Sequence, residues 1–570
     1  MKRFVSLTII ILGLAFGAWA QIGPATNSFR NASTSGTGLI EDDLDLLIGY
    51  RGFLDPSRIP LVEGKRLYTS LANIVNKQEE VFNPTDLRDV HGYFLIGGSS
   101  KLMNYGSVGA FYDRLGYSTP RALDPVVYPG GIRGHGERTD VIHTTNPGGQ
   151  TIQDVIKRTA DSNRDTVSTQ MLVGIGRYLW ETKRVGIAFY HFDMSQEDEE
   201  WGDTTLARRF GNYTYSRTVT NLVTGQITEN DTMTGTQKEG DNASRNLIGL
   251  AGWMPYGEKY SLGLQIMTGL VSASPKDEAK YDGTFNRTGI ETRTVNGSRK
   301  MTFTSSGISL DGRLSAIYKW SDATDSRVDL GFGMTNAKNK SGDQFEEMVS
   351  NSYTGTFFNS TGDTTLTTFS GTKDNAGRLD FFARTTSKLS DRVTFGMGVG
   401  FNSSNLETKL VADEIGHNVV TFRQNAGGPP SPFDFTQTTV DSLKREIDTT
   451  GSSLVFSIPV GLEFHLTEPV VFRLGANHLI TTSDLTVTDQ VVSWSAPRTR
   501  TVFGDGRIIE ITALPGPFVS RSNTVKTKSS QTIYTYGAGW NYSDRLQLDF
   551  MGFAVLDDLT NWKLSATFKF

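Results

Sequence analysis

The chain has no cysteine, little proline and no long apolar run after its start. Zero cysteine among 570 residues excludes a disulfide framework, thiol catalysis, thiolate metal sites and a lipid-modified N-terminal cysteine. The 56 basic and 61 acidic residues give a net charge of −5, without the basic clusters of a nucleic-acid-binding protein. Beyond residue 20, no apolar stretch reaches the roughly 18 residues that a transmembrane helix needs. With 37% apolar residues, the composition alone favours a soluble secreted protein.

The first 20 residues have the pattern of a secretory signal peptide. Lys2 and Arg3 precede a mostly apolar segment, residues 4–16, and Ala18-Trp19-Ala20 supplies the small-residue cleavage pattern. The apolar segment is short for a permanent membrane-spanning helix, which is the alternative. We therefore expect cleavage after Ala20 and export from the cytoplasm.

Alternation of apolar and polar residues recurs along the rest of the chain and predicts β-strands. It is clearest in residues 454–464 and 562–570, where every second side chain is apolar. Pairs of such segments are joined by short polar turns, and successive pairs are separated by long tracts rich in Thr, Asn, Asp, Ser and Gly. The turns lie near residues 99–107, 180–184, 255–259, 320–327, 388–392, 466–469 and 541–545. Short turns at one end and long polar tracts at the other are typical of a transmembrane β-barrel.

A soluble β-sandwich is the alternative, because it also alternates apolar and polar residues. Two observations favour the barrel. The polar faces combine charge with many of the 60 glycines, which the dry interior of a sandwich would not tolerate. Aromatic residues also gather near the short turns, as expected for rings at a membrane interface. They are Trp180, Trp253, Tyr256, Tyr260, Trp320, Trp540 and Tyr542.

The C-terminal segment resembles the terminal strand signal of bacterial outer-membrane β-barrel proteins. Its alternate positions are Trp562, Leu564, Ala566, Phe568 and Phe570. The resemblance implies that the barrel assembly machinery reads this strand and that the protein resides in the bacterial outer membrane. It also implies contact with outer-membrane lipid and lipopolysaccharide.

The seven turns join 14 strands, and the C-terminal segment adds one more. An even number is expected, so residues 66–75 are our candidate for the first strand. The sequence thus predicts one all-β, antiparallel, up-and-down transmembrane barrel of about 16 strands, over residues 65–570, with short periplasmic turns and long extracellular loops. The main alternative is 14 strands. Residues 81–84, Val-Phe-Asn-Pro, resemble an element of FadL-like transporters but are too few to carry that family over.

Residues 21–64 precede the predicted barrel and contain an acidic-apolar run, residues 41–48, and a proline-bounded segment, residues 55–60. We expect a small hatch inside or under the barrel. A periplasmic tail and a misread first strand are the alternatives.

Nothing in the sequence has the spacing of a catalytic or metal site. A barrel hydrolase would need a histidine beside a serine or aspartate at one rim, and three of the seven histidines fall near the predicted loop ends. We nevertheless expect no enzymatic activity, no metal and no cofactor. The histidines are His91, His135, His143, His191, His417, His465 and His478.

Charged residues on the polar strand faces are the candidate functional residues. A barrel of about 16 strands is wide enough for an aqueous channel, and inward charges would set its selectivity. We expect a channel or transporter for an unidentified small solute, with a mixed, mildly cationic lumen. One alternative is that the charges pair across strands; another is an adhesion or interaction barrel acting through its loops. The predicted lumen-lining residues are Arg177, Arg313, Asp329, Asp380, Arg384, Glu463, Arg473, Asp549 and Lys563.

Overall fold

A computed structural model describes most of the chain. The described residues are 29–34, 37–48, 53–72, 92–120, 134–145, 151–199, 212–288, 290–302, 304–339, 344–355, 359–424, 429–513, 520–552 and 563–570. Residues 1–20, residues 81–84 and Trp562 lie outside this range, so the signal peptide, the FadL-like element and the first position of the terminal signal stay predictions.

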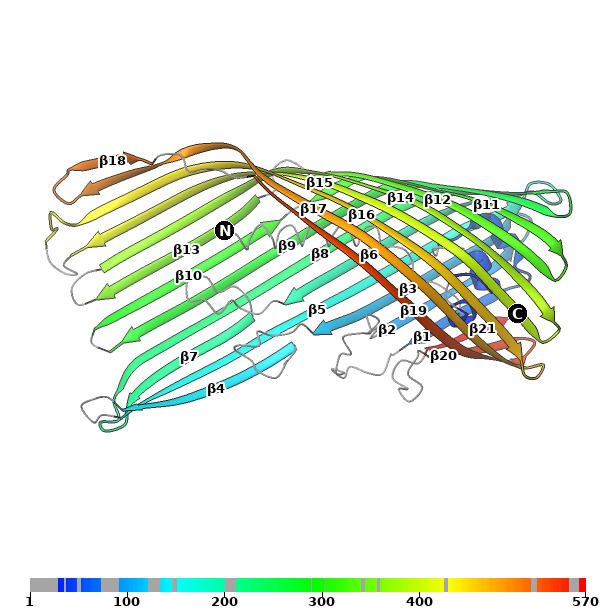
Figure 1. Ribbon diagram of the computed structural model, residues 1–570, viewed down its shortest axis with the longest axis horizontal. Helices are drawn as coiled ribbons and strands as arrows, with labels where there is room; N and C mark the ends of the chain where they lie inside the picture. The colour runs from blue at the N-terminus through cyan, green and yellow to red at the C-terminus, as the bar shows by residue number, and fades with distance from the viewer. Residues whose placement is uncertain are drawn as a thin grey trace.

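Sixteen antiparallel strands form a closed barrel (Figure 1). Each pairs with the next, and the last pairs with the first, Arg66 standing opposite Lys569. The wall strands are β1 (Arg66–Ala72), β2 (Gly92–Leu102), β3 (Gly106–Pro120), β5 (Thr151–Tyr178), β6 (Arg184–Glu199), β8 (Ile227–Tyr256), β9 (Tyr260–Arg287), β11 (Ser305–Ser321), β12 (Thr324–Asn339), β14 (Asn359–Ser390), β15 (Val393–Arg423), β16 (Phe435–His465), β17 (Val470–Phe503), β19 (Arg521–Ser543), β20 (Leu546–Gly552) and β21 (Lys563–Lys569).

The count of 16 and the antiparallel topology confirm the predicted fold, and the alternative of 14 strands is wrong. All seven predicted short turns join consecutive wall strands, and β1 lies within the predicted first-strand window. These turns gather at one end of the barrel, the turn end, to the right in Figure 1. The opposite end is the loop end.

At the loop end the wall is extended by five further strands: β4 (Gly134–Thr145), β7 (Asn212–Asn221), β10 (Glu291–Thr302), β13 (Gln344–Gly355) and β18 (Ile508–Thr512). Much of each polar tract that was expected to be loop is therefore strand. These tracts lack clear alternation because neither face of the extended sheet has to meet hydrocarbon. Thr-rich sequence still suits a strand there because threonine is β-branched.

The outer surface of the wall is apolar. On β9, Leu262, Leu264 and Ile266 are exposed on the outside, whereas Gln265 between them is buried inside the barrel. An apolar outer band on a closed barrel is the architecture that crosses a membrane with every strand hydrogen-bonded. Among the described residues, no helix is long and apolar enough to cross a membrane.

Most of the predicted aromatic residues lie exposed at the turn end. Trp320 packs edge-on against Tyr318, with ring centroids 4.6 Å apart, and Trp540 packs in the same way against Tyr542 at 5.2 Å. Trp253 is the exception, because it is only 4% exposed and faces the interior. Its place in an interfacial ring was therefore wrongly predicted.

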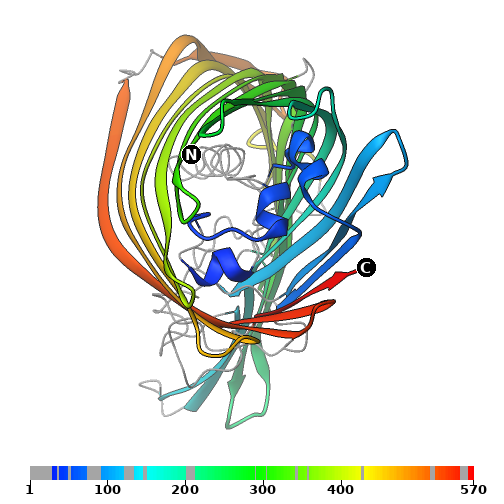
Figure 2. The same cartoon turned by 90° about the vertical axis from the view of Figure 1, so that its right-hand side faces the viewer.

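The N-terminal segment lies inside the barrel at the turn end (Figure 2). It contains α2 (Phe29–Ser33), α3 (Asp43–Leu47) and the 3₁₀ helix η1 (Pro56–Leu61). Asp42 caps α3 by accepting hydrogen bonds from the backbone of Leu44 and Asp45, and Asp55 caps η1 in the same way. We call the described residues 29–34, 37–48 and 53–62 the plug.

An apolar core joins the plug to the inner wall. The plug contributes seven buried side chains, and β1, β2, β3, β5, β6, β8 and β9 contribute the rest. Phe53 packs edge-on against Tyr190 and Phe192, with ring centroids 5.7 and 5.8 Å apart. The plug is therefore seated against one side of the barrel by apolar burial, which favours docking by removing that surface from water. Its buried side chains in this core are Leu44, Leu47, Ile48, Phe53, Leu54, Ile59 and Val62.

Candidate functional site: the plugged lumen

The first anchor of the plug is a chain of ion pairs that runs from α2 into the wall. Arg30 reaches both carboxylate oxygens of Glu463 on β16, at 2.6 and 2.8 Å. Glu463 also accepts from Arg473 on β17 at 2.9 Å, and Arg473 donates to Asp549 on β20 at 2.6 Å. The three wall residues in this series of ion pairs are only 1–3% exposed. Each buried charge is therefore stabilised by its partner rather than by water.

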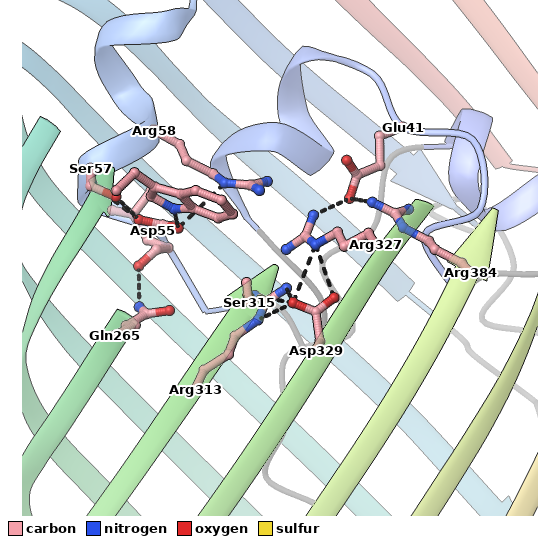
Figure 3. Close-up of polar contacts among 12 residues, drawn as sticks. Glu41, Asp55, Ser57, Arg58, Gln265, Arg313, Ser315, Arg327, Asp329 and Arg384 are labelled. Atoms are coloured by element: carbon pink, nitrogen blue, oxygen red, sulfur yellow. Dashed lines mark hydrogen bonds and ion pairs between the residues drawn. The ribbon is translucent and has the colours of Figure 1, made fainter. Parts of the chain in front are cut away.

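The second anchor is Glu41, which receives two guanidinium groups from the nearby wall strands β12 and β14 (Figure 3). Arg384 on β14 lies 2.7 Å from its carboxylate and Arg327 on β12 lies 3.2 Å from it. Burial by itself raises the pKa of Glu41, but the charges of Arg384 and Arg327 outweigh it and hold the pKa below its usual value.

Behind Glu41 the wall continues the network. Arg327 also contacts Asp329 at 2.9 Å, and Arg313 on β11 donates to the same carboxylate at 2.9 Å. Ser315 hydrogen-bonds Asp329 as well. Arg327 therefore bridges a carboxylate of the plug and a carboxylate of the wall.

The third anchor holds the start of η1. The Trp253 indole donates to Asp55 at 2.8 Å, while the backbone nitrogen and hydroxyl of Ser57 donate to the other oxygen of Asp55. The Leu54 carbonyl accepts from the Tyr190 hydroxyl at 2.6 Å and from the Gln265 amide at 2.9 Å. These wall side chains satisfy polar groups of the plug that would otherwise be buried without partners.

A cavity of about 360 Å³ opens on the loop-end side of the plug. Arg245, Asp311, Arg378 and Asp484 form its charged part, and Arg245 also lies 5.9 Å from the ring of Phe53 in the plug. Asp311 contacts Arg245 and lies 3.1 Å from Arg378. The remaining lining comes from small or hydroxyl-bearing residues together with two leucines; it includes Gly333, Thr335, Ser404, Leu406, Ser453 and Leu485.

An apolar cluster adjoins this cavity. Buried Ala243, Val271 and Ala273 from β8 and β9 meet buried Leu410 and Ile447 from β15 and β16. The two groups come from non-neighbouring strands, so they meet across the interior of the barrel. Leu406 contacts the cluster and also lines the cavity. The cavity therefore lies beside an apolar constriction.

Seven of the nine predicted lumen-lining residues have described side chains facing the interior. Six of them form the ion pairs of the first two anchors: Arg313, Asp329, Arg384, Glu463, Arg473 and Asp549. The seventh, Asp380, lies 3.1 Å from Arg378 and contacts Asn402. These charges pair across strands and with the plug, which is the alternative that the sequence left open.

Arg177 was wrongly placed in the lumen. It is exposed and shares its strand face with Met171, Val173 and Ile175, which are exposed on the outside. The alternation at the end of β5 was misread because the inward residues there are Leu172 and two glycines rather than charged side chains. Lys563 belongs to β21, but its side chain lies outside the described set.

Sequence reasoning predicted several of the wall residues but missed their plug partners Arg30, Glu41 and Asp55. Arg30, Glu41 and Asp55 have no periodic pattern, and their partners lie hundreds of residues away. The glycines on the inward strand faces did indicate where the plug contacts the wall. A side chain at Gly176 or Gly186 would overlap Pro56 of the plug, so these glycines mark where another backbone approaches the wall.

The described residues contain no cluster of three His, Cys, Asp or Glu side chains suited to a metal ion. His191 on β6 contacts Asp193 and Asn246, each at 2.7 Å. His478 on β17 contacts Thr532 at 2.9 Å and Ser530 at 3.3 Å.

No protein-family model matches the chain, and no curated protein matches it. Solved outer-membrane barrels are similar to it over most of its length. The toluene transporter TbuX of Ralstonia pickettii is 10% identical, with a TM-score of 0.28, over 95% of this chain and 97% of that one. A FadL homologue of Pseudomonas aeruginosa is 10% identical, with a TM-score of 0.22, over 96% and 99%.

The ferric enterobactin receptor PfeA of Pseudomonas aeruginosa, as a mutant, is 8% identical with a TM-score of 0.24, over 89% of this chain and 80% of that one. Likenesses this weak carry no argument about what the chain transports or binds. The evidence for its function therefore comes from its own barrel, plug and cavity.

Proposed function

We propose that the chain is an outer-membrane transporter in which the plug must shift before a small solute passes. The observation that carries the proposal is the plugged lumen: a closed barrel whose turn end is filled by a segment of the same chain, with a cavity of about 360 Å³ beyond it. The anchors at Arg30 and Glu41 are ion pairs and hydrogen bonds. Hydrogen bonds to water can replace such contacts with only a modest net loss of free energy, so this part of the plug can be released.

The setting is part of the proposal. The apolar outer band favours contact with outer-membrane lipid and lipopolysaccharide, and the exposed aromatic residues at the turn end favour a membrane interface there. The terminal strand, which closes the barrel against β1, is the segment through which the assembly machinery would act. Export would follow cleavage after Ala20, and the mechanism requires no enzymatic step, metal or cofactor.

A reversible lock on the plug tests the mechanism. A Cβ on Gly461 would lie 3.1 Å from the Cβ of Thr34, close to the separation of about 3.5–4.5 Å in a disulfide. The double variant Thr34→Cys/Gly461→Cys would contain the only two cysteines in the chain. We expect ion conductance in planar bilayers and solute uptake into liposomes to be lost on oxidation and restored by a reductant.

The single variant Gly461→Cys is the control, because it cannot form the intramolecular bond. Equal conductance in the locked and reduced forms would refute a moving plug. If the wild type, the reduced variant and a plug-displacing variant all pass neither ions nor solutes, the transport proposal itself fails.

A surface interaction barrel is the second candidate, and the height of the wall favours it. Strands β14 to β17 contain 31–34 residues each, whereas a membrane-crossing strand needs about 9–11. The excess forms a polar sheet at the loop end that a partner could bind. A variant in which these strands are shortened outside the membrane would separate the two functions. Partner binding should be lost in this variant while solute uptake persists.

A further inference from the structure

Arg58 of the plug is a buried cation whose hydrogen bonds are incomplete. Its residue is 3% exposed, and its guanidinium carbon lies 4.4 Å from the centre of the Trp253 ring. Within the described part of the chain, its Nε and Nη1 atoms have no hydrogen-bond partner. Burial without a full set of hydrogen-bond partners is unfavourable for a guanidinium group, because the water it loses is not fully replaced.

Asp55 is the acid nearest to Arg58, but it is committed elsewhere. Its Oδ2 atom lies 3.5 Å from Arg58 Nε, too far for a good hydrogen bond, and accepts the Trp253 indole at 2.8 Å. Its Oδ1 atom accepts the backbone nitrogen and hydroxyl of Ser57. Asp55 therefore attracts Arg58 without satisfying its nitrogen atoms.

Arg58 has like-charged neighbours, since Arg327 and Arg313 both act on it. The cluster drawn in Figure 3 contains four guanidinium groups and three carboxylates, those of Glu41, Asp55 and Asp329. Burial and the like charge of Arg327 lower the pKa of Arg58 to about 9, which records how unfavourable this position is for a cation. Asp325 on β12, a further acid, interacts with Arg384 and Arg327 and supplies a fourth negative charge at the edge of this network. The four guanidinium groups belong to Arg58, Arg313, Arg327 and Arg384.

We propose that a small monovalent inorganic anion, of the chloride class, binds between Arg58 of the plug and Arg327 of the wall. Figure 3 shows the Arg58 guanidinium pointing toward Arg327 across the plug–wall junction. A negative charge there accepts hydrogen bonds from the unsatisfied nitrogens of Arg58 and offsets the repulsion between Arg58 and Arg327. Arg327 already bridges Glu41 and Asp329, so the anion would extend this bridge to η1.

The consequence is that the anion fastens the plug. Because the site is complete only when the plug is seated, binding stabilises the seated state by mass action. The anion is thus a ligand of the resting barrel and differs from a transported solute held in the cavity around Arg245. The protein could bind this anion without transporting a solute, and it could transport a solute without binding this anion.

Hydrogen exchange measured on the full-length protein tests the site. Residues 53–62 would be monitored by mass spectrometry in chloride and in gluconate at equal ionic strength. We expect exchange about tenfold slower at a chloride concentration ten times the dissociation constant. Arg58→Gln should abolish the difference, whereas Arg217→Gln, which removes an arginine paired with Asp154 and Glu229 outside the cluster, should retain it.

Bromide provides a second measurement that needs no variant. In crystals of the wild type grown in bromide, an anomalous peak in contact with the Arg58 and Arg327 guanidinium groups is expected. Identical exchange in chloride and gluconate, a chloride response that persists in Arg58→Gln, or bromide crystals without this peak would overturn the proposal.

Discussion

Gly176 decides how closely the plug can approach the wall. It lies on the inward face of β5, where a Cβ atom would overlap the carbonyl oxygen of Pro56 at the start of η1. The clash is with backbone, so it cannot be relieved by rotating a side chain. This glycine therefore makes room for another part of the chain.

We expect Gly176→Ala to displace η1 while leaving the barrel folded. Overpacking of this kind costs about 1–3 kcal/mol, which is about five- to 150-fold faster exchange of residues 53–62. Hydrogen exchange measures this directly, and higher conductance in planar bilayers should accompany it. The matched control is Gly116→Ala on β3, because a Cβ there meets nothing within 4 Å. Unchanged exchange in Gly176→Ala would contradict the close approach of plug and wall.

At the scale of elements, the wall was predictable from the sequence, whereas the contacts of the plug with the wall were not. A hairpin of β16 and β17 is local: its two strands alternate and only a short turn separates them, so a window of the sequence contains the whole signal. The contact between Arg30 and Glu463 joins residues 433 positions apart, and the sequence around either residue gives no indication of the other. Trp253 was misplaced for the same reason, because its partner Asp55 belongs to the plug.

The plug should loosen in acid because of Glu41. Its pKa is held below the usual 4.5 in the seated plug by Arg384 and Arg327, and it would return to the usual value on release. Its contribution is therefore complete above about pH 4.5 and is lost as the pH falls through the lowered value. Proteolysis of the plug by an acid protease should accelerate only below this range.

In Glu41→Gln the acid step should disappear, because the titrating group is gone, although the plug would be weaker at neutral pH. Asp140 on β4, which pairs with Arg138 and Arg158 at the loop end, provides a matched carboxylate outside the plug. Asp140→Asn should leave the acid step in place. An unaltered step in Glu41→Gln would show that another group controls it.

The whole molecule has an apolar outside and a polar, filled inside, which is the reverse of a soluble domain. This inversion explains how a chain with 37% apolar residues can suit a membrane, because only alternate residues of the crossing segments need to be apolar. The loop-end strands then add many polar residues without adding any hydrocarbon-facing surface.

Tryptophan quenching by brominated lipids can place the membrane along this molecule. Trp320 and Trp540 are 60% and 47% exposed at the turn end, so single-tryptophan variants that retain either one should be quenched most by bromine near the headgroups. A variant that retains only Trp253 should resist quenching, because this residue is 4% exposed inside the barrel. Strong quenching of Trp253, or none of Trp320 and Trp540, would contradict the proposed orientation.

The pairing of β1 with β21 has a consequence for the order of assembly. This seam joins the first wall strand to the last, so the ring cannot close until the C-terminal residues have been delivered. Until then, β1 can wait with one edge unpaired, and such long-range pairing is slow to form. The plug immediately precedes β1 in the chain, so its entry can be completed while the seam is still open. Closure of the seam would then seal the plug in its seat as the final step of biogenesis.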